Sequence, residues 1–104
     1  MDKILSERLD LIEEICKKYR VENLYAFGSS CTNRFTELSD LDFLINFEKN
    51  ISIEEYTDNY FFIIDEFEKI FSRKIEILTT NSLSNPYFLK TLEKTKKLLY
   101  ERRD

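Results

Sequence analysis

A single glycine, Gly28, most constrains the backbone of this 104-residue chain. It ends the segment 23–28, whose apolar residues predict a short buried strand, and it is followed at once by Ser29. Glycine lets a chain turn sharply at the end of a strand and leaves backbone amides open to a ligand. A serine hydroxyl and free N–H groups after such a turn can bind phosphate oxygens. The sequence therefore predicts a phosphate-binding turn.

Three acidic residues follow on two further predicted strands. Ten residues after the Gly-Ser pair come Asp40 and Asp42, at the start of a predicted strand over 41–47. Side chains alternate along a strand, so these two carboxylates share a face, and such a pair suits magnesium bound with a nucleoside triphosphate. Glu76, on a predicted strand over 74–79, joins them if the two strands lie side by side in register. Three carboxylates would repel one another unless a cation neutralised them.

The composition excludes several other chemistries. There is no histidine, so Ser-His-Asp catalysis, a histidine base and histidine-ligated zinc are all excluded. Cys16 and Cys31 form no CxxC motif, and Cys16 lies on the apolar stripe of the first predicted helix. The net charge of −4 argues against a protein that binds nucleic acid through its phosphates. Catalysis by this chain must use carboxylates, a metal, or both.

The chain is expected to form one cytoplasmic domain, 1–104. Its apolar fraction of 42% is enough for a core, and one glycine and one proline argue against linkers. No apolar run approaches the roughly 18 residues of a membrane span, and no signal-peptide pattern opens the chain. We therefore expect no membrane partner.

The predicted fold is a two-layer α/β (α+β) domain with a small mixed three-stranded sheet packed with helices. An amphipathic helix is expected over 3–20, and Ser52 opens a second helix that runs to about Phe71, with Ile53 in its core stripe. Asn85 and a proline open the last helix, which is expected to carry Leu99 towards the core. The predicted order is α-β-β-α-β-α.

The glycine and the three acids together resemble a known superfamily. Gly28-Ser29, the ten-residue gap, Asp40-Leu41-Asp42 and Glu76 resemble the nucleotidyltransferases that include DNA polymerase beta. From its first helix to the closing LLYER of residues 98–102, the chain is similar to the smallest branch, the minimal nucleotidyltransferases (MNT). The resemblance implies a partner of the all-helical HEPN class. It also implies a toxin–antitoxin pair, in which the MNT antitoxin neutralises the toxin by transferring AMP to it.

The resemblance also implies the roles of particular residues. The substrate would be ATP with two Mg²⁺ ions, and the acceptor would be a hydroxyl, that of a tyrosine of the partner. A positive charge that family members commonly carry just after Gly-Ser would come from Arg34, because this chain has Ser30 there. By position, the catalytic and metal-binding residues would be Asp40, Asp42 and Glu76, and the phosphate-binding residues Gly28, Ser29, Ser30 and Arg34.

Two other functions stay open. Phe61 and Phe62 fall partly outside the apolar stripe of their helix, and Tyr87 is a third candidate for exposure. Exposed aromatic residues commonly anchor interfaces, so the chain could be a non-catalytic module that masks a helical partner. Nucleotidyl transfer to a small molecule such as an antibiotic is less favoured, because nothing here resembles the additional domain that forms such a pocket. A homo-oligomer is compatible with all three functions: transfer to a toxin, masking, and transfer to a small molecule.

Overall fold

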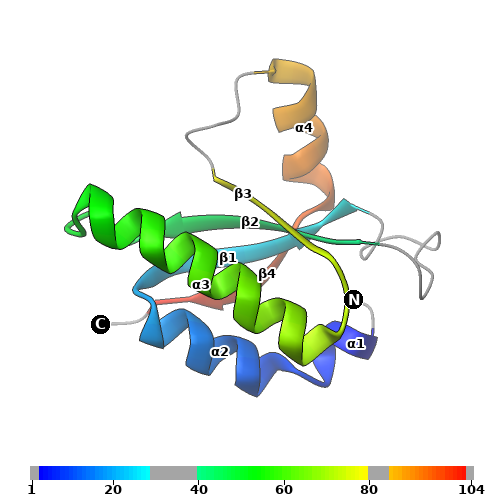
Figure 1. The fold of residues 1–104 in the computed structure, drawn as a ribbon. Helices are drawn as coiled ribbons and strands as arrows, with labels where there is room; N and C mark the ends of the chain where they lie inside the picture. Colours follow the sequence, from blue (N-terminus) through cyan, green and yellow to red (C-terminus); the bar gives the residue numbers. More distant parts are fainter. Residues whose placement is uncertain (1–2, 29–39, 80–84, 103–104) are drawn as a thin grey trace.

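The computed structural model describes residues 3–28, 40–79 and 85–102, which form a four-stranded sheet with helices on both faces (Figure 1). None of the described helices is long and apolar enough to cross a membrane. In chain order the elements are α1 (Lys3–Ser6), α2 (Leu9–Lys18), β1 (Val21–Phe27), β2 (Leu41–Phe47), α3 (Ile53–Phe71), β3 (Ile75–Thr79), α4 (Pro86–Thr95) and β4 (Lys97–Glu101).

The sheet is mixed, and its strand order is β3-β2-β1-β4. Strand β2 is parallel to β3, while β1 is antiparallel to both β2 and β4. The predicted class is therefore confirmed, and β2 has a neighbour on each side, as expected from its apolar residues on both faces.

The prediction of three strands was wrong, because β4 adds a fourth. The last helix ends at Thr95, and Leu99 lies on β4 instead of on that helix. Strand β4 pairs with the edge of β1 that β2 leaves free, and it buries Tyr100 in the core. An unpaired backbone edge is costly when it is buried, so pairing with β1 outweighs the continuation of a polar helix.

The single helix predicted over 3–20 is broken into α1 and α2. The break lies beside Arg8, whose Nε donates a hydrogen bond of 2.8 Å to the carbonyl oxygen of Ile70. That carbonyl belongs to the last turn of α3, where helical oxygens lack intrahelical partners. The guanidinium also lies 5.8 Å from the ring centre of Phe71. The Arg8 side chain therefore connects the segment between α1 and α2 to the end of α3.

Helix α3 begins and ends where local signals place it. The Ser52 side chain accepts a hydrogen bond of 3.1 Å from the backbone N–H of Glu55, which confirms the predicted capping position. Ser72 ends the helix in the left-handed conformation, with φ of 53°. Ile53, expected in the core stripe, is 86% exposed, because the first turn of α3 extends beyond the sheet (Figure 1).

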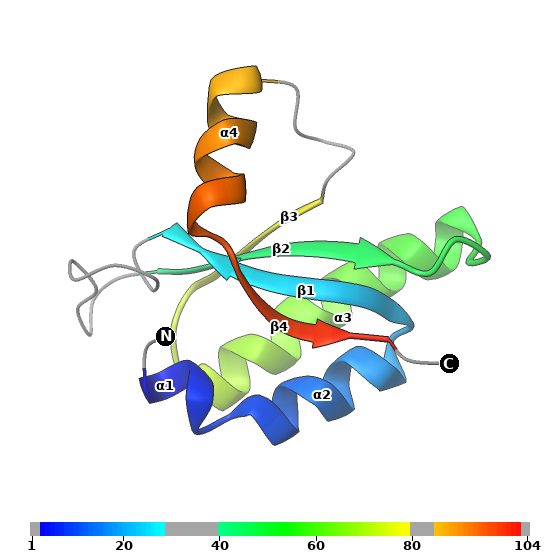
Figure 2. The same cartoon turned by 180° about the vertical axis from the view of Figure 1, so that it is seen from behind.

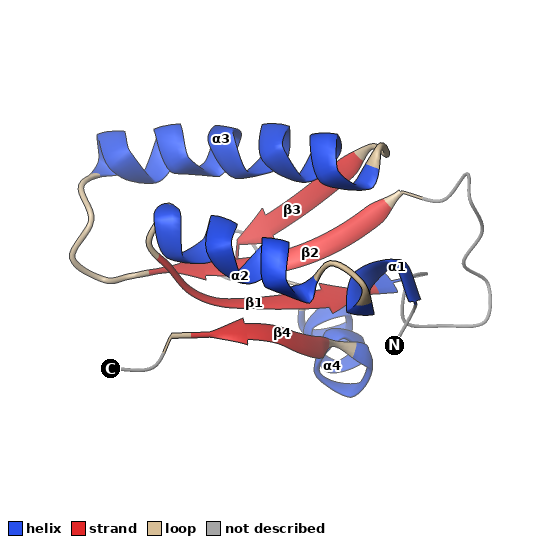
Figure 3. Ribbon diagram, turned by 90° about the horizontal axis from the view of Figure 1, so that it is seen from below, coloured by secondary structure: helices blue, strands red, loops and turns tan. Residues whose placement is uncertain are grey.

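The two faces of the sheet are covered unequally. Helices α1, α2 and α3 pack on one face over the larger core cluster, in which the Phe43 and Phe67 rings lie 5.1 Å apart (Figures 2 and 3). Cys16 is buried in this cluster, as the sequence predicted. On the other face, α4 covers a small cluster of Phe27, Leu44 and Leu92. Part of this second face is left for polar side chains.

The core and the surface of α3 should respond very differently to the loss of a phenylalanine. Phe67 is fully buried, so Phe67→Ala should lower the free energy of unfolding by about 3–5 kcal/mol. Phe61→Ala, at a largely exposed position of the same helix, should change it by no more than about 0.5 kcal/mol. Urea unfolding monitored by circular dichroism measures both, and equal losses would contradict this packing.

Candidate active site

The predicted phosphate-binding turn begins directly beside an acid of the sheet. Gly28 follows β1 with φ of 73°, a conformation that other residues rarely adopt. A Cβ atom added to Gly28 would lie 2.5 Å from Oδ2 of Asp42. Glycine is therefore required twice here, for the turn and for the close approach of the Asp42 carboxylate.

The three strands next to this turn bring two of the predicted acids together. Asp42 is the register partner of Phe27 on β1 and of Glu76 on β3. The condition for bringing Glu76 to Asp42, that the two acidic strands lie side by side in register, is thus met. Leu41 and Phe43, which flank Asp42 in sequence, are buried under α1–α3. Because side chains alternate, the two acids lie on the opposite face, which α4 covers only in part.

The carboxyl group of Asp42 has a raised pKa, caused by burial and by the neighbouring acids. The pKa of the Asp42 carboxyl is raised to about 6, firstly because burial disfavours its charged form. A hydrogen bond with Glu76 and the negative charges of Glu76 and Asp40 raise this pKa further. Asp40 itself is exposed just before β2. At neutral pH the site holds carboxylates whose mutual repulsion a bound cation would relieve.

The oxygen ligands at this site are of the type that binds a hard divalent cation. Their side chains are not arranged around a single point. Asp42 and Glu76 supply oxygen ligands, which Mg²⁺ prefers. Within residues 3–28, 40–79 and 85–102, no group of three His, Cys, Asp or Glu side chains is close enough to hold a metal ion. The other predicted phosphate-binding residues, Ser29, Ser30 and Arg34, lie outside the described residues.

A tyrosine that the sequence assigned only to the core supports the strand of Glu76. The Tyr60 hydroxyl donates a hydrogen bond of 2.7 Å to the backbone oxygen of Ile77. Strand β3 is at the edge of the sheet, so this bond satisfies a carbonyl that has no neighbouring strand. Burial raises the pKa of Tyr60, and the hydroxyl stays a donor at neutral pH. The sequence signal for this role was a tyrosine within an apolar stripe of Ile and Phe residues, because a buried hydroxyl needs a hydrogen-bond partner.

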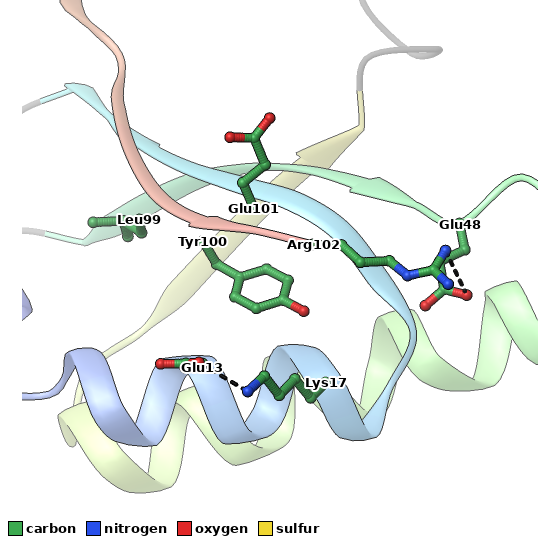
Figure 4. Close-up of a pocket in the computed structure, with 7 residues that line it drawn as sticks. All are labelled: Glu13, Lys17, Glu48, Leu99, Tyr100, Glu101 and Arg102. Carbon is green, nitrogen blue, oxygen red and sulfur yellow. Dashed lines mark ion pairs between the residues drawn. The ribbon is translucent and has the colours of Figure 1, made fainter. Parts of the chain in front are cut away.

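A cavity of about 570 Å³ lies between α2 and β4, away from the acids (Figure 4). Four of the five charged side chains that line it form ion pairs with each other: Lys17 with Glu13 at 2.9 Å, and Arg102 with Glu48 at 3.5 Å. Tyr100 points into the space between strand and helix. These charges are largely neutralised by one another, so this cavity offers a weaker case for a reactive centre than the acids beside Gly28.

Comparison with known proteins decides the family. Residues 10–104 match the family described as "Polymerase beta, Nucleotidyltransferase". The chain belongs to this family. It is accordingly an enzyme of the nucleotidyltransferase class, and the resemblance seen in its sequence is confirmed. The match extends over all four strands and includes Gly28, Asp42 and Glu76.

Sequence relatives of this chain are named as putative protein adenylyltransferases. Two proteins of Methanocaldococcus jannaschii, each named "putative protein adenylyltransferase", are 34% identical to the nucleotidyltransferase described above, over 97 and 95 residues. Each match covers 88% of this chain and 93% of the relative.

Solved structures share the fold at low sequence identity. A "putative minimal nucleotidyltransferase" has a TM-score of 0.70 at 20% identity, with 93% of this chain and 95% of that chain covered. A toxin–antitoxin complex with AMP-PNP has a TM-score of 0.67 at 12% identity, covering 91% and 74%. A complex of a tri-AMPylated Shewanella oneidensis HEPN toxin with an MNT antitoxin has a TM-score of 0.62 at 11% identity, covering 94% and 73%.

Removing the charge of Glu76 should lower the pKa of Asp42. In metal-free protein, folded Asp42 keeps its proton up to about pH 6, whereas the ordinary value is 3.8. Stability should therefore fall as pH rises from about 4 to about 6, since the folded state binds the extra proton. Glu76→Gln should lower the Asp42 pKa below 6 and flatten this dependence.

Carbon-13 NMR of the Asp42 carboxyl and thermal unfolding in EDTA measure the two effects. Asp58→Asn, on the exposed face of α3, is the matched control and should leave the Asp42 titration unchanged. An unchanged pKa in Glu76→Gln would show that the two acids do not interact.

Gly28→Ala should both strain the turn and displace the Asp42 carboxylate. Alanine at this φ costs about 1 kcal/mol, and its Cβ meets Asp42 Oδ2. Ser72→Gly is the opposite change at φ of 53° and should stabilise the protein by up to about 1 kcal/mol. Urea unfolding measures both variants. A Gly28→Ala protein as stable as the wild type would contradict the geometry of the turn.

Proposed function

We propose that this nucleotidyltransferase is a Mg-ATP-dependent protein adenylyltransferase that acts as an antitoxin. It would transfer AMP to a tyrosine hydroxyl of a HEPN-class helical toxin in the cytoplasm. The observation that carries the proposal is the register of Asp42 with Glu76 beside the turn at Gly28. Its support from relatives is twofold: two are named as protein adenylyltransferases, and a fold neighbour is an MNT antitoxin with an AMPylated HEPN toxin.

The roles in this proposal are those that the family resemblance of the sequence implies. Backbone amides after Gly28, with Ser29, Ser30 and Arg34, would bind the triphosphate of ATP. Asp40, Asp42 and Glu76 would hold two Mg²⁺ ions. Bound Mg²⁺ would supply the positive charge that neutralises the triphosphate and stabilises the pyrophosphate leaving group.

Glu76 would also face the acceptor. Its side chain is exposed on the partly covered face of the sheet, where a tyrosine of another protein can approach. A carboxylate there can orient the acceptor hydroxyl and accept its proton as the oxygen attacks the α-phosphorus. The bond from that phosphorus to pyrophosphate breaks in the same step, so AMP is transferred and pyrophosphate leaves.

Loss of the central acid should abolish transfer without unfolding the protein. Asp42→Asn removes a metal-binding charge and should reduce the transfer rate about 1000-fold, a loss of about 4 kcal/mol of transition-state stabilisation. Transfer is measured with α-labelled ATP, MgCl₂ and a purified HEPN protein encoded beside this chain. Glu13→Gln, which removes an acid of the exposed α2 surface, is the control and should keep full activity. Label transfer by Asp42→Asn at close to the wild-type rate would contradict the proposed role of the acids.

A second candidate function is neutralisation by masking alone. It is favoured by the exposure of Phe61, Phe62 and Tyr87, which are 62%, 51% and 81% accessible. Co-expression with the toxin separates the two functions, because Asp42→Asn should fail to rescue growth if transfer is required. Full rescue by Asp42→Asn would favour masking.

A further inference from the structure

Two adjacent phenylalanines are exposed on the outward face of α3. Neither Phe61 nor Phe62 belongs to the core clusters. The Phe61 ring centre lies 5.3 Å from that of Tyr60, and the Phe62 ring centre lies 5.7 Å from that of Tyr19. Each ring is therefore steadied on one side and open on the other. Single exposed apolar residues are common, but two exposed phenylalanines at consecutive positions give one helix face more apolar surface than a single residue does.

Acidic residues surround these two rings. Residues three and four apart are neighbours on a helix surface, so Asp58 and Asp65 each flank both rings. Glu54 extends the same face one turn earlier. Asp65 forms an ion pair of 3.0 Å with Lys69, whereas Asp58 forms no ion pair with another described residue.

This surface is on the opposite side of the sheet from the candidate active site. Helix α3 packs with α1 and α2 on one face, while Asp42 and Glu76 lie on the face that α4 partly covers (Figure 3). A molecule bound to the outward face of α3 would leave the acids and the turn at Gly28 open. It would therefore not compete with a nucleotide.

We propose that the acidic aromatic surface of α3 docks a basic amphipathic helix of a partner protein. The surface consists of Glu54, Asp58, Phe61, Phe62 and Asp65. Apolar side chains of the partner helix cover the two phenyl rings, and lysines or arginines beside them meet the aspartates. Aromatic anchors within a charged rim are typical of protein interfaces.

The charge of α3 selects this occupant over others. The helix carries six acidic residues, EE at 54–55, D at 58 and 65, and E at 66 and 68, against one lysine. Ion pairs with Arg20, Lys18 and Lys69 engage Glu55, Glu66 and Asp65, and among the described residues Glu54, Asp58 and Glu68 form none. A second copy placed helix against helix would oppose like charges, which is costly at an interface. Anionic lipid and nucleic acid are repelled for the same reason.

Docking on this face needs no nucleotidyl transfer. If the partner is also the acceptor of AMP, a step that rests on the proposed function, docking raises the effective concentration of the acceptor. Loss of the surface then raises KM for the acceptor protein and leaves kcat and ATP binding unchanged.

The surface can be tested without the natural partner. Full-length nitrogen-15-labelled protein is titrated with a helical Leu/Lys amphipathic peptide and, in parallel, with a Leu/Glu peptide of the same pattern. We expect the Leu/Lys peptide to shift amide signals on the outward face of α3 and to leave Asp42 and Glu76 unaffected. Binding should weaken as salt is raised, because part of the attraction is between charges.

Two double variants and one matched control locate the contact. Phe61→Ser with Phe62→Ser, and separately Asp58→Lys with Asp65→Lys, should each weaken binding at least tenfold. Tyr87→Ser removes an 81% exposed aromatic ring from α4 and should leave the affinity unchanged. Thermal unfolding checks that each variant folds, and if the double serine variant does not, the charge-reversed variant decides.

Three results would overturn the proposal: equal binding of the Leu/Glu peptide, unchanged affinity in a folded double variant, or signal shifts confined to other surfaces. Self-association that shifts α3 signals as protein concentration rises would also overturn it, in favour of a second copy. None of these outcomes depends on catalysis, so failure of the docking surface is distinguishable from failure of the proposed transfer.

Discussion

The parallel pairing of β2 with β3 holds together two carboxylates that repel each other. Backbone hydrogen bonds between the strands fix Asp42 opposite Glu76, and the raised pKa of Asp42 reflects the burial and the repulsion that result. Because the fold keeps the two carboxylates close together, a positive charge bound between them would be strongly favoured. Gly28 approaches the carboxylate of Asp42 at the same point, and in the proposed function metal and nucleotide meet there.

The two faces of the sheet are covered unequally, which leaves Asp42 and Glu76 accessible from one side. Three helices seal one face with a large apolar cluster, which gives the strands a rigid base. On the other face α4 contributes only a small cluster around Leu92, so the acids stay partly accessible. The same division leaves the outer surface of α3 facing away from the chemistry, where binding of a partner and transfer of a nucleotide do not obstruct each other. The proposed catalytic site and the proposed docking surface thus lie on opposite sides of the sheet, with the larger apolar core on the side of α3.

The sequence by itself determined features whose causes are local. The turn at the lone glycine, the alternation that turns Asp42 away from the buried Leu41 and Phe43, and the Ser52 cap all follow from neighbouring residues. Strand β2 was predicted with its observed bounds, because its apolar residues on both faces fit only a strand with neighbours on each side. The family, too, could be recognised from the spacing of these few residues.

Only the tertiary structure decided the features that depend on distant partners. Strand β4 forms because β1 has a free edge, and no signal within residues 97–101 reveals that edge. The break between α1 and α2 lies beside Arg8, whose hydrogen-bond partner Ile70 is 62 residues away in sequence. Tyr60 supports β3 for the same kind of reason. Local patterns encode local geometry, whereas the pairing of unsatisfied backbone groups is settled when the elements meet.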